Sequence, residues 1–414
     1  MSSINEILLA PINNLNREDF FKVLQKSSYS DRKFFLKKIL HDKFSPIFIN
    51  YINDNQLHDL FDNKELESLR NQSKRFQIQS LEIVKEVIHL NKLFKNEGLN
   101  PTFLKGVALM SEYSDISLRP AVDIDVLFDG EEVFDADAIL KKNNYKGLFF
   151  DYSRDDLKKY IKDKNHLPHL RRNTNITVEL HNRVTLPQDF KDCPLSNKII
   201  RNQKSINFYG ENIFIPSIND LVVHLLIHFS LNSNFKNLLR VFSDIAQIEK
   251  NYEIDWNKIY QNCRDRKIRK ALSLSLEVLN YYQKLTNNFI DLKKNYKEFF
   301  PVKETVLIAN KETFSLKIEE EKITKESLYQ MGKARNVISF FKIVWSKFLP
   351  KKNQLIIDYR VSNPNNFKII YFSFFNIFSR IIRYTPIVVS IFFKRGLFFD
   401  HFKDVNQTED WLNS

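Results

Sequence analysis

The chain has 414 residues, 43% of them hydrophobic, which is enough for two or three domains with hydrophobic cores. Its 63 Lys and Arg against 50 Asp and Glu give a formal net charge of +13, which favours a polyanionic ligand such as a nucleotide, a nucleic acid or an anionic membrane. Two cysteines without C-x-x-C spacing argue against a disulfide framework and a structural zinc site, and seven glycines leave no Walker-type phosphate loop and no G-x-G-x-x-G turn.

Residues 1–98 are predicted to form a helical cap. Their apolar residues recur at helical intervals, first between Phe20 and Leu40 and again over residues 73–96. Gly98 is expected to end the last of these helices. The amino terminus has no basic segment followed by a long apolar core, so no secretory signal is expected and the protein is predicted to be cytoplasmic.

Residues 99–215 are predicted to be an α/β core that begins with a strand, a turn and a helix. Residues 101–104 are expected to form the strand and residues 107–113 the helix, with Lys105 and Gly106 at the turn. Gly106 permits close approach of the backbone to a triphosphate at the helix N-terminus. Lys105 either supplies a cation there or is a solvated side chain.

The alternation of residues 122–126 predicts a strand with Asp123 and Asp125 on one face, roughly 6.5 to 7 Å apart along the backbone. Such an acid pair alone is typical of an exposed sheet edge. Here it is interleaved with Val and Ile and followed by a second acid-bearing strand, which favours a functional site. Arg119, just before the strand, either binds phosphate oxygens or neutralises a nearby carboxylate.

Residues 176–181 are predicted to form that second strand, with Glu179 and His181 on one face. His181 either orients a carboxylate, contacts an acceptor molecule, supports a metal ligand or simply packs. Just before it, His166 and His169 cluster with two arginines and either meet the nucleotide or the acceptor or form a solvated hairpin shoulder. Between the two acid-bearing strands we expect a helix at 133–143, a short strand at 148–152 and a charged helix or loop at 155–164.

Three carboxylates aimed at one point repel one another and lose solvation, so their convergence usually indicates a bound divalent cation. Oxygen ligands favour Mg²⁺ or Mn²⁺, and two such ions can clamp a transferring nucleotidyl group. If the two strands pair, Asp123, Asp125 and Glu179 are therefore the expected metal ligands.

Together these residues resemble the polymerase-beta-like nucleotidyltransferase superfamily, and more closely its bacterial branch of uncharacterised nucleotidyltransferases with a K-G-x-A-L signature. The resemblance covers about residues 73–282 and implies an α+β fold, in which a small mixed sheet forms the core between N-terminal and C-terminal helical domains. It rests on Leu104, Lys105, Gly106, Ala108, Leu109, Tyr113, Arg119, residues 123–127 and residues 178–181.

The resemblance also implies roles for the carboxylates and histidines. Asp123, Asp125 and Glu179 would be the catalytic residues that hold Mg²⁺ or Mn²⁺, and Glu179 would help to deprotonate or orient an attacking hydroxyl. His181 and His169 would contact the acceptor or support a metal ligand.

For the triphosphate, the resemblance implies contacts from Lys105, Gly106 and Arg119. Val107 follows Gly106 where a second Gly or a Ser is usual in the wider superfamily. This change removes a side-chain hydroxyl contact to the triphosphate and leaves a backbone contact at Gly106 in place.

Residues 216–350 are predicted to form a helical domain. His224 and His228 lie one helical turn apart, which is metal-compatible spacing, but no Glu completes an H-E-x-x-H motif, so a zinc hydrolase is not favoured. On the next predicted helix, Arg240 and Asp244 are expected to form an exposed ion pair or to contact the acceptor.

Residues 351–414 are a basic, Phe-rich tail that includes an apolar segment at 369–398. The uncharged runs in this segment are only about ten residues long, too short to span a bilayer. The segment either packs against the helical domain or lies on the anionic inner face of the membrane. Residues 406–414 are expected to be frayed.

The leading hypothesis is a metal-dependent enzyme that transfers an NMP from an NTP, such as ATP, to a hydroxyl-bearing acceptor and releases pyrophosphate. The acceptor would be a small molecule, a saccharide or a peptide, as in surface polysaccharide or natural-product biosynthesis. The alternative is a non-catalytic nucleotide-binding or membrane-peripheral assembly factor on the same fold. Nucleic acid is not favoured as a partner, because the sequence has no aromatic-basic recognition motif.

Overall fold

The computed structural model describes residues 3–147, 152–172, 176–186, 194–233, 235, 238–282, 287–313 and 397–414. These residues fall into two compact units. The first is built mainly from residues 1–300 and contains the sheet, and the second contains most of helix α15 (Lys303–Thr313) and helix α20 (Leu397–Asn413). Residues 314–350 of the predicted helical domain, and nearly all of the predicted strand at 148–152 and of the segment 369–398, lie outside the described residues.

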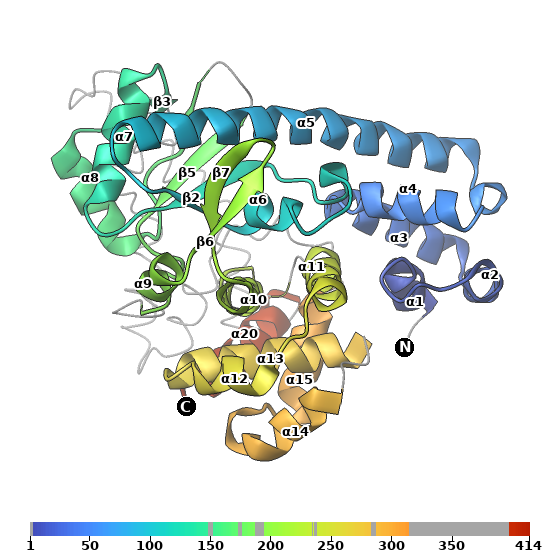
Figure 1. Cartoon of the computed structure of the whole chain (residues 1–414). Helices are drawn as coiled ribbons and strands as arrows, with labels where there is room; N and C mark the ends of the chain where they lie inside the picture. The colour runs from blue at the N-terminus through green and yellow to red at the C-terminus, as the bar shows by residue number, and fades with distance from the viewer. Residues whose placement is uncertain are drawn as a thin grey trace, which may run out of the picture. The chain divides into compact units, whose positions relative to one another are not determined.

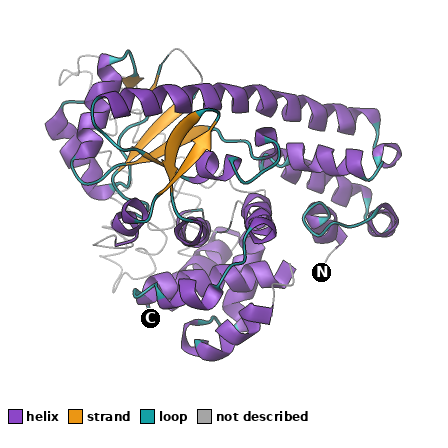
Figure 2. Cartoon of the chain, in the orientation of Figure 1, coloured by secondary structure: helices purple, strands orange, loops and turns teal. Residues whose placement is uncertain are grey.

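The amino-terminal part of the first unit is helical, as the sequence predicts (Figures 1 and 2). Its helices are α1 (Ser3–Leu9), α2 (Arg17–Gln25), α3 (Tyr29–His41), α4 (Ser45–Asp54), the short η1 (His58–Leu60) and α5 (Asn63–Asn96). Helix α5 begins ten residues before the predicted start at residue 73, because Asp62 and Glu65 form a capping box there. It ends just before Gly98, whose φ of +79° suits glycine.

A seven-stranded mixed sheet follows, in the order β3-β4-β5-β2-β1-β7-β6. Its strands are β1 (Thr102–Phe103), β2 (Asp123–Leu127), β3 (Lys146–Gly147), β4 (Leu170–Arg171), β5 (Thr177–His181), β6 (Lys204–Phe208) and β7 (Glu211–Ile215). The pairs β2–β5 and β1–β7 are parallel and the other pairs are antiparallel. This is the α+β architecture with a small mixed core sheet that the sequence predicts.

The long helix α5 covers the apolar face of the sheet (Figure 1). Ile124 and Val126 of β2 are fully buried, and Phe128 continues the same alternation. The ring of Phe128 meets the ring of Phe94 on α5 edge to face, with centroids 4.9 Å apart. The carboxylates of β2 therefore point to the opposite face.

The connections of the sheet contain further helical segments: α6 (Lys105–Met110), η2 (Ile116–Leu118), α7 (Glu132–Lys142), α8 (Arg154–Tyr160), η3 (Ile161–Asp163) and α9 (Pro194–Arg201). Helix α6 begins at Lys105, so the prediction of a turn there with the helix starting at 107 is wrong by two residues. Lys105 has a φ of +41°, which is unfavourable for a residue with a side chain.

After the sheet, the described residues as far as η5 are mainly helical. The helices are α10 (Ile218–Ile227), α11 (Leu238–Asn251), α12 (Trp256–Gln261), α13 (Arg266–Tyr282), α14 (Asn287–Asn295) and the short η5 (Lys297–Phe299). The segment His228–Asn232, labelled η4, is a π-helical turn that continues α10. Such turns often occur at functional sites.

In the second unit, the prediction of a frayed end is wrong, because helix α20 extends to Asn413 and Leu412 is buried. No helix among the described residues combines the length and the hydropathy that a membrane-spanning segment needs.

Candidate active site

The two acid-bearing strands lie side by side. Strands β2 and β5 are parallel, with Asp125 opposite Glu179 and Asp123 opposite Thr177. Partners in a parallel ladder project to the same side of the sheet, so Asp123, Asp125 and Glu179 share one face. The pairing on which the predicted convergence depends is therefore present.

Asp125 is buried and is held by a lysine and a histidine. One carboxylate oxygen, Oδ1, lies 2.8 Å from Nζ of Lys105 and 2.8 Å from Nε2 of His181. Burial alone would raise the pKa of Asp125, but Lys105 and His181 outweigh it and hold this pKa well below the ordinary value. Asp125 is therefore ionised at neutral pH.

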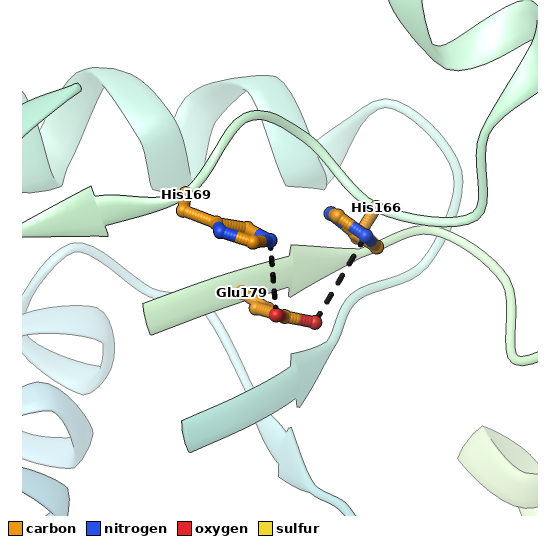
Figure 3. A group of neighbouring side chains, drawn as sticks. All are labelled: His166, His169 and Glu179. Carbon is orange, nitrogen blue, oxygen red and sulfur yellow. Dashed lines mark ion pairs between the residues drawn. The ribbon is translucent and has the colours of Figure 1, made fainter. Parts of the chain in front are cut away.

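Three histidines surround Glu179, and Figure 3 shows two of them, His166 and His169. Its Oε1 is 3.0 Å from Nε2 of His169, and its Oε2 is 3.4 Å from Nε2 of His181 and 4.0 Å from Nε2 of His166. Burial opposes ionisation, but the hydrogen bonds from His169 and His181 lower the pKa of Glu179 below its ordinary value. The predicted residues Glu179, His181 and His169 are thus in direct contact.

Asp123 is the carboxylate whose charge is least compensated. Burial and the neighbouring charges of Asp125 and Glu179 raise its pKa from 3.8 to about 6, against the opposing effects of Lys105 and Arg240. A carboxylate in this environment gains most from an added cation.

Lys43, which the sequence did not single out, and Arg240 both interact electrostatically with Asp123. Lys43, in the turn between α3 and α4, has its pKa lowered by burial and by the positive charges of Arg240 and Arg119, while Asp123 opposes the shift. Burial and Arg119 lower the pKa of Arg240 on α11 to about 10. The Nε of Arg240 is buried and has no hydrogen-bond partner within the described residues. Lys43 and Arg240 thus place positive charge from two distant segments next to the carboxylates.

Gly106 is required by packing. A Cβ on Gly106 would lie 2.8 Å from Cβ of Ala121, which is closer than side-chain carbons approach one another. Val107, the next residue, is fully buried. Val107 therefore serves the hydrophobic core.

Arg119 is committed to a buried ion pair. Its Nε donates to Oδ1 of Asp244 on α11 at 2.6 Å, and the hydroxyl of Tyr113 donates to the same oxygen at 2.9 Å. Asp244 is only 1% exposed. The prediction of an exposed pair between Arg240 and Asp244 is therefore wrong, because α11 turns Asp244 inward to Arg119. A contact between Arg119 and a triphosphate stays a prediction.

His224 and His228 lie close to the same cluster. Burial and the charge of Lys105 lower the pKa of both rings, that of His228 to about 3, so both are neutral at neutral pH. His224 is buried, and neither of its ring nitrogens has a hydrogen-bond partner among the described residues. The helical spacing of the two histidines was visible in the sequence, but nothing there indicated that their helix faces the carboxylate cluster.

A family model described as an uncharacterised nucleotidyltransferase matches residues 30–283, more than half of the chain and the whole of the carboxylate cluster. Among curated proteins none matches the chain.

Proposed function

The chain belongs to this family of nucleotidyltransferases, and from that premise we propose that it transfers an NMP from an NTP to a hydroxyl-bearing acceptor in a metal-dependent reaction. The observation that carries the proposal is the register of β2 and β5, which sets Asp123, Asp125 and Glu179 on one face. In the reaction, a bond forms between the acceptor oxygen and the α-phosphorus as the bond to the pyrophosphate oxygen breaks. The hydroxyl proton passes to a base or to water.

The donor set fits Mg²⁺ or Mn²⁺. All three side chains offer carboxylate oxygens, and the raised pKa of Asp123 indicates negative charge that lacks a full counter-charge. We assign Asp123 and Asp125 as metal ligands, with Glu179 completing the set. When bound, the metal would neutralise charge on the phosphates.

Glu179 is suited to hold the acceptor. It is ionised, and His169 and His181 fix its orientation through hydrogen bonds. The His169 side chain is 37% exposed and that of Glu179 is 14% exposed, so this end of the cluster is open to solvent. An acceptor hydroxyl can donate to the Glu179 carboxylate there, which would orient its oxygen for attack.

The triphosphate would bind on the basic side of Asp123. Lys43 and Arg240 supply positive charge there, and Lys105 and Gly106, for which the sequence predicts a phosphate contact, lie at the start of α6. Lys105 is 21% exposed and bonded to Asp125, so it can contact both the carboxylate and a phosphate oxygen. We include Arg119 as a third cation, acting over a longer range because Asp244 holds it.

The experiment is to incubate the purified protein with each labelled NTP, Mg²⁺ or Mn²⁺ and a cell extract, then to identify the labelled product and measure released pyrophosphate. Asp125→Asn should abolish labelling without unfolding the protein, whereas Asp135→Asn, a change on α7 outside the cluster, should not. Near wild-type turnover by Asp125→Asn would overturn the proposal. Binding of NTP without pyrophosphate release from any extract would instead support the non-catalytic alternative.

The labelled product would also identify the acceptor class. We propose a saccharide, a peptide or another small molecule that bears a hydroxyl group, handled in the cytoplasm or at the inner face of the membrane. Because surface charge steers polyanions to this basic protein, an NTP and a phosphorylated acceptor would both be attracted to it.

A further inference from the structure

One end of the carboxylate cluster is rich in imidazole. The nitrogens of His166 and His169 and the carboxylate of Glu179 all lie within 4.8 Å of one another, and Figure 3 shows both rings directed at the carboxylate. The two distances to Glu179 are 3.0 Å from Nε2 of His169 and 4.0 Å from Nε2 of His166. They bracket the roughly 3.3 Å that separates ligand atoms around a tetrahedral ion with bonds of about 2.0 Å.

The hydrogen bond of His166 to the backbone turns its second ring nitrogen toward Glu179. Its Nδ1 lies 2.7 Å from the carbonyl oxygen of Leu167, and a carbonyl oxygen can only accept, so Nδ1 carries the proton. The other ring nitrogen, Nε2, faces Oε2 of Glu179 at 4.0 Å, which is beyond hydrogen-bond distance. A cation between them would satisfy both, and a backbone carbonyl on the distal nitrogen is the usual support of a metal-bound histidine.

The backbone fixes the histidines to the strand that carries Glu179. His166 forms a β-bridge with His181, and the Leu167 amide donates to the carbonyl oxygen of Leu180 at 2.8 Å. The rings of His166 and His169 are stacked, with centroids 5.1 Å apart. The sheet therefore holds the side chains of His166, His169 and Glu179 in place.

We propose that His166, His169 and Glu179 form a second metal site, distinct from Asp123 and Asp125, that takes a transition-metal ion such as Zn²⁺. Two imidazoles and one carboxylate suit Zn²⁺ and its first-row neighbours, whereas Mg²⁺ prefers the all-oxygen set of the aspartates. The histidine side chains are 21% and 37% exposed, so an ion there keeps open positions for water or an acceptor oxygen. The site shares Glu179 with the proposed reaction but does not depend on nucleotidyl transfer.

The test is to titrate the metal-free protein with Co²⁺ in the presence of excess Mg²⁺ and without nucleotide. The visible absorption of the bound Co²⁺ measures the binding. Wild type should bind one Co²⁺ with the intense bands of a four- or five-coordinate site that contains nitrogen ligands. His166→Ala and His169→Ala should each weaken this binding by on the order of a hundredfold or more. Asp123→Asn should retain it, and His58→Ala, a change at an exposed histidine in the helical cap, is the matched control.

Three outcomes would overturn the proposal: no Co²⁺ binding by wild type, unchanged binding by both His166→Ala and His169→Ala, or loss of binding in Asp123→Asn alone. The last would assign the ion to the aspartates. Circular dichroism of each variant shows whether it folds, and His166→Gln, which keeps a polar side chain, replaces His166→Ala if that variant does not. The visible absorption of bound Co²⁺ does not depend on nucleotidyl transfer. Absence of metal binding at this site and absence of transferase activity can therefore be told apart.

Discussion

Gly106 and Ala121 lie so close that a Cβ on Gly106 would come within 2.8 Å of the Cβ of Ala121. Ala121 lies just before strand β2, and Gly106 lies in the first turn of α6. This contact sets the distance between the Lys105 end of α6 and the carboxylates of β2. The packing of this contact therefore requires a residue without a Cβ at position 106.

Gly106→Ala should lower the free energy of unfolding by about 1–3 kcal/mol, because the added methyl overpacks a buried contact. Ala121→Gly removes the opposing carbon, so the double variant should recover most of that loss. Denaturant unfolding of the two single variants and the double variant measures the coupling. Simple additivity of the two single effects would show that the contact is not the cause.

The buried pair of Arg119 and Asp244 predicts a large effect far from the signature motifs. Asp244→Asn would leave Arg119 buried without its counter-charge, and breaking such a pair costs on the order of 3–5 kcal/mol. Urea unfolding should show this loss. Replacing both residues by apolar side chains, Arg119→Met with Asp244→Leu, should restore much of the stability, since neither charge then remains buried. A double variant as unstable as Asp244→Asn would contradict this explanation.

Lys43 is predicted to bind the triphosphate. Lys43→Gln should weaken NTP binding roughly tenfold or more, because hydrogen bonds to charged groups contribute about 1.5–3 kcal/mol. Lys37→Gln, on the exposed side of α3, removes the same charge at a distance and should change binding little. Fluorescence or calorimetric titration with a non-hydrolysable NTP measures both. Equal effects of the two changes would indicate general charge attraction and no specific contact.

Local patterns were sufficient to predict the two acid-bearing strands. Alternation placed Asp123 with Asp125 and Glu179 with His181, and the observed register of β2 and β5 brings these faces together. The sequence could not show that Arg119 would be taken by Asp244, because that contact joins segments 125 residues apart and depends on how α11 turns. Lys43 was missed for the same reason, since a lysine in a short turn carries no local signal of its distant neighbours.

The hairpin of β6 and β7 was also missed. Its turn is formed by Tyr209 and Gly210, both with positive φ, and only the glycine is typical of such a turn. The predicted start of α6 was wrong because Lys105 adopts a backbone conformation that favours glycine. Its ion pair with Asp125 is a tertiary contact that offsets this cost, and local propensity does not include it.

The buried imidazole of His224, which lies near the site, should lower the free energy of unfolding of the protein. Both of its ring nitrogens are buried without partners among the described residues, at a cost of about 1–3 kcal/mol for an unsatisfied group. His224→Leu, of similar volume, should therefore raise the free energy of unfolding by about that amount at neutral pH. The folded-state pKa lies below the ordinary 6.5, so the unfolded chain binds a proton first as the pH falls. The gain should thus grow below about pH 6.5.

The control for this prediction is His58→Leu, which replaces an exposed histidine and should have little effect. Unfolding curves at several pH values measure both variants. A His224→Leu variant that is less stable than wild type by the same amount at every pH would contradict the prediction. It would show that the imidazole makes favourable contacts in the folded protein. Loss of nucleotidyl transfer in a stabilised His224→Leu would show that the ring is retained for activity.

Asp123 links stability to pH and to metal. Its folded-state pKa of about 6 exceeds the ordinary 3.8, so between these values the folded protein holds a proton that the unfolded chain has lost. Stability should therefore fall as the pH rises from about 4 to about 6 and stay low above that.

Asp123→Asn does not titrate and should be more stable than wild type by about 1–3 kcal/mol at pH 8, and nearly equal to it at pH 4. Mg²⁺ or Mn²⁺ at pH 8 should stabilise wild type and leave the variant nearly unchanged, because only wild type offers the carboxylate to the ion. Urea unfolding of both proteins at pH 4 and pH 8 measures the difference in stability at each pH. Urea unfolding at pH 8 with and without the metal measures how much the ion stabilises each protein. A variant that is less stable than wild type at pH 8 without metal would show that Asp123 is already neutralised by Lys105, Lys43 and Arg240, and that the cluster has no need of a cation.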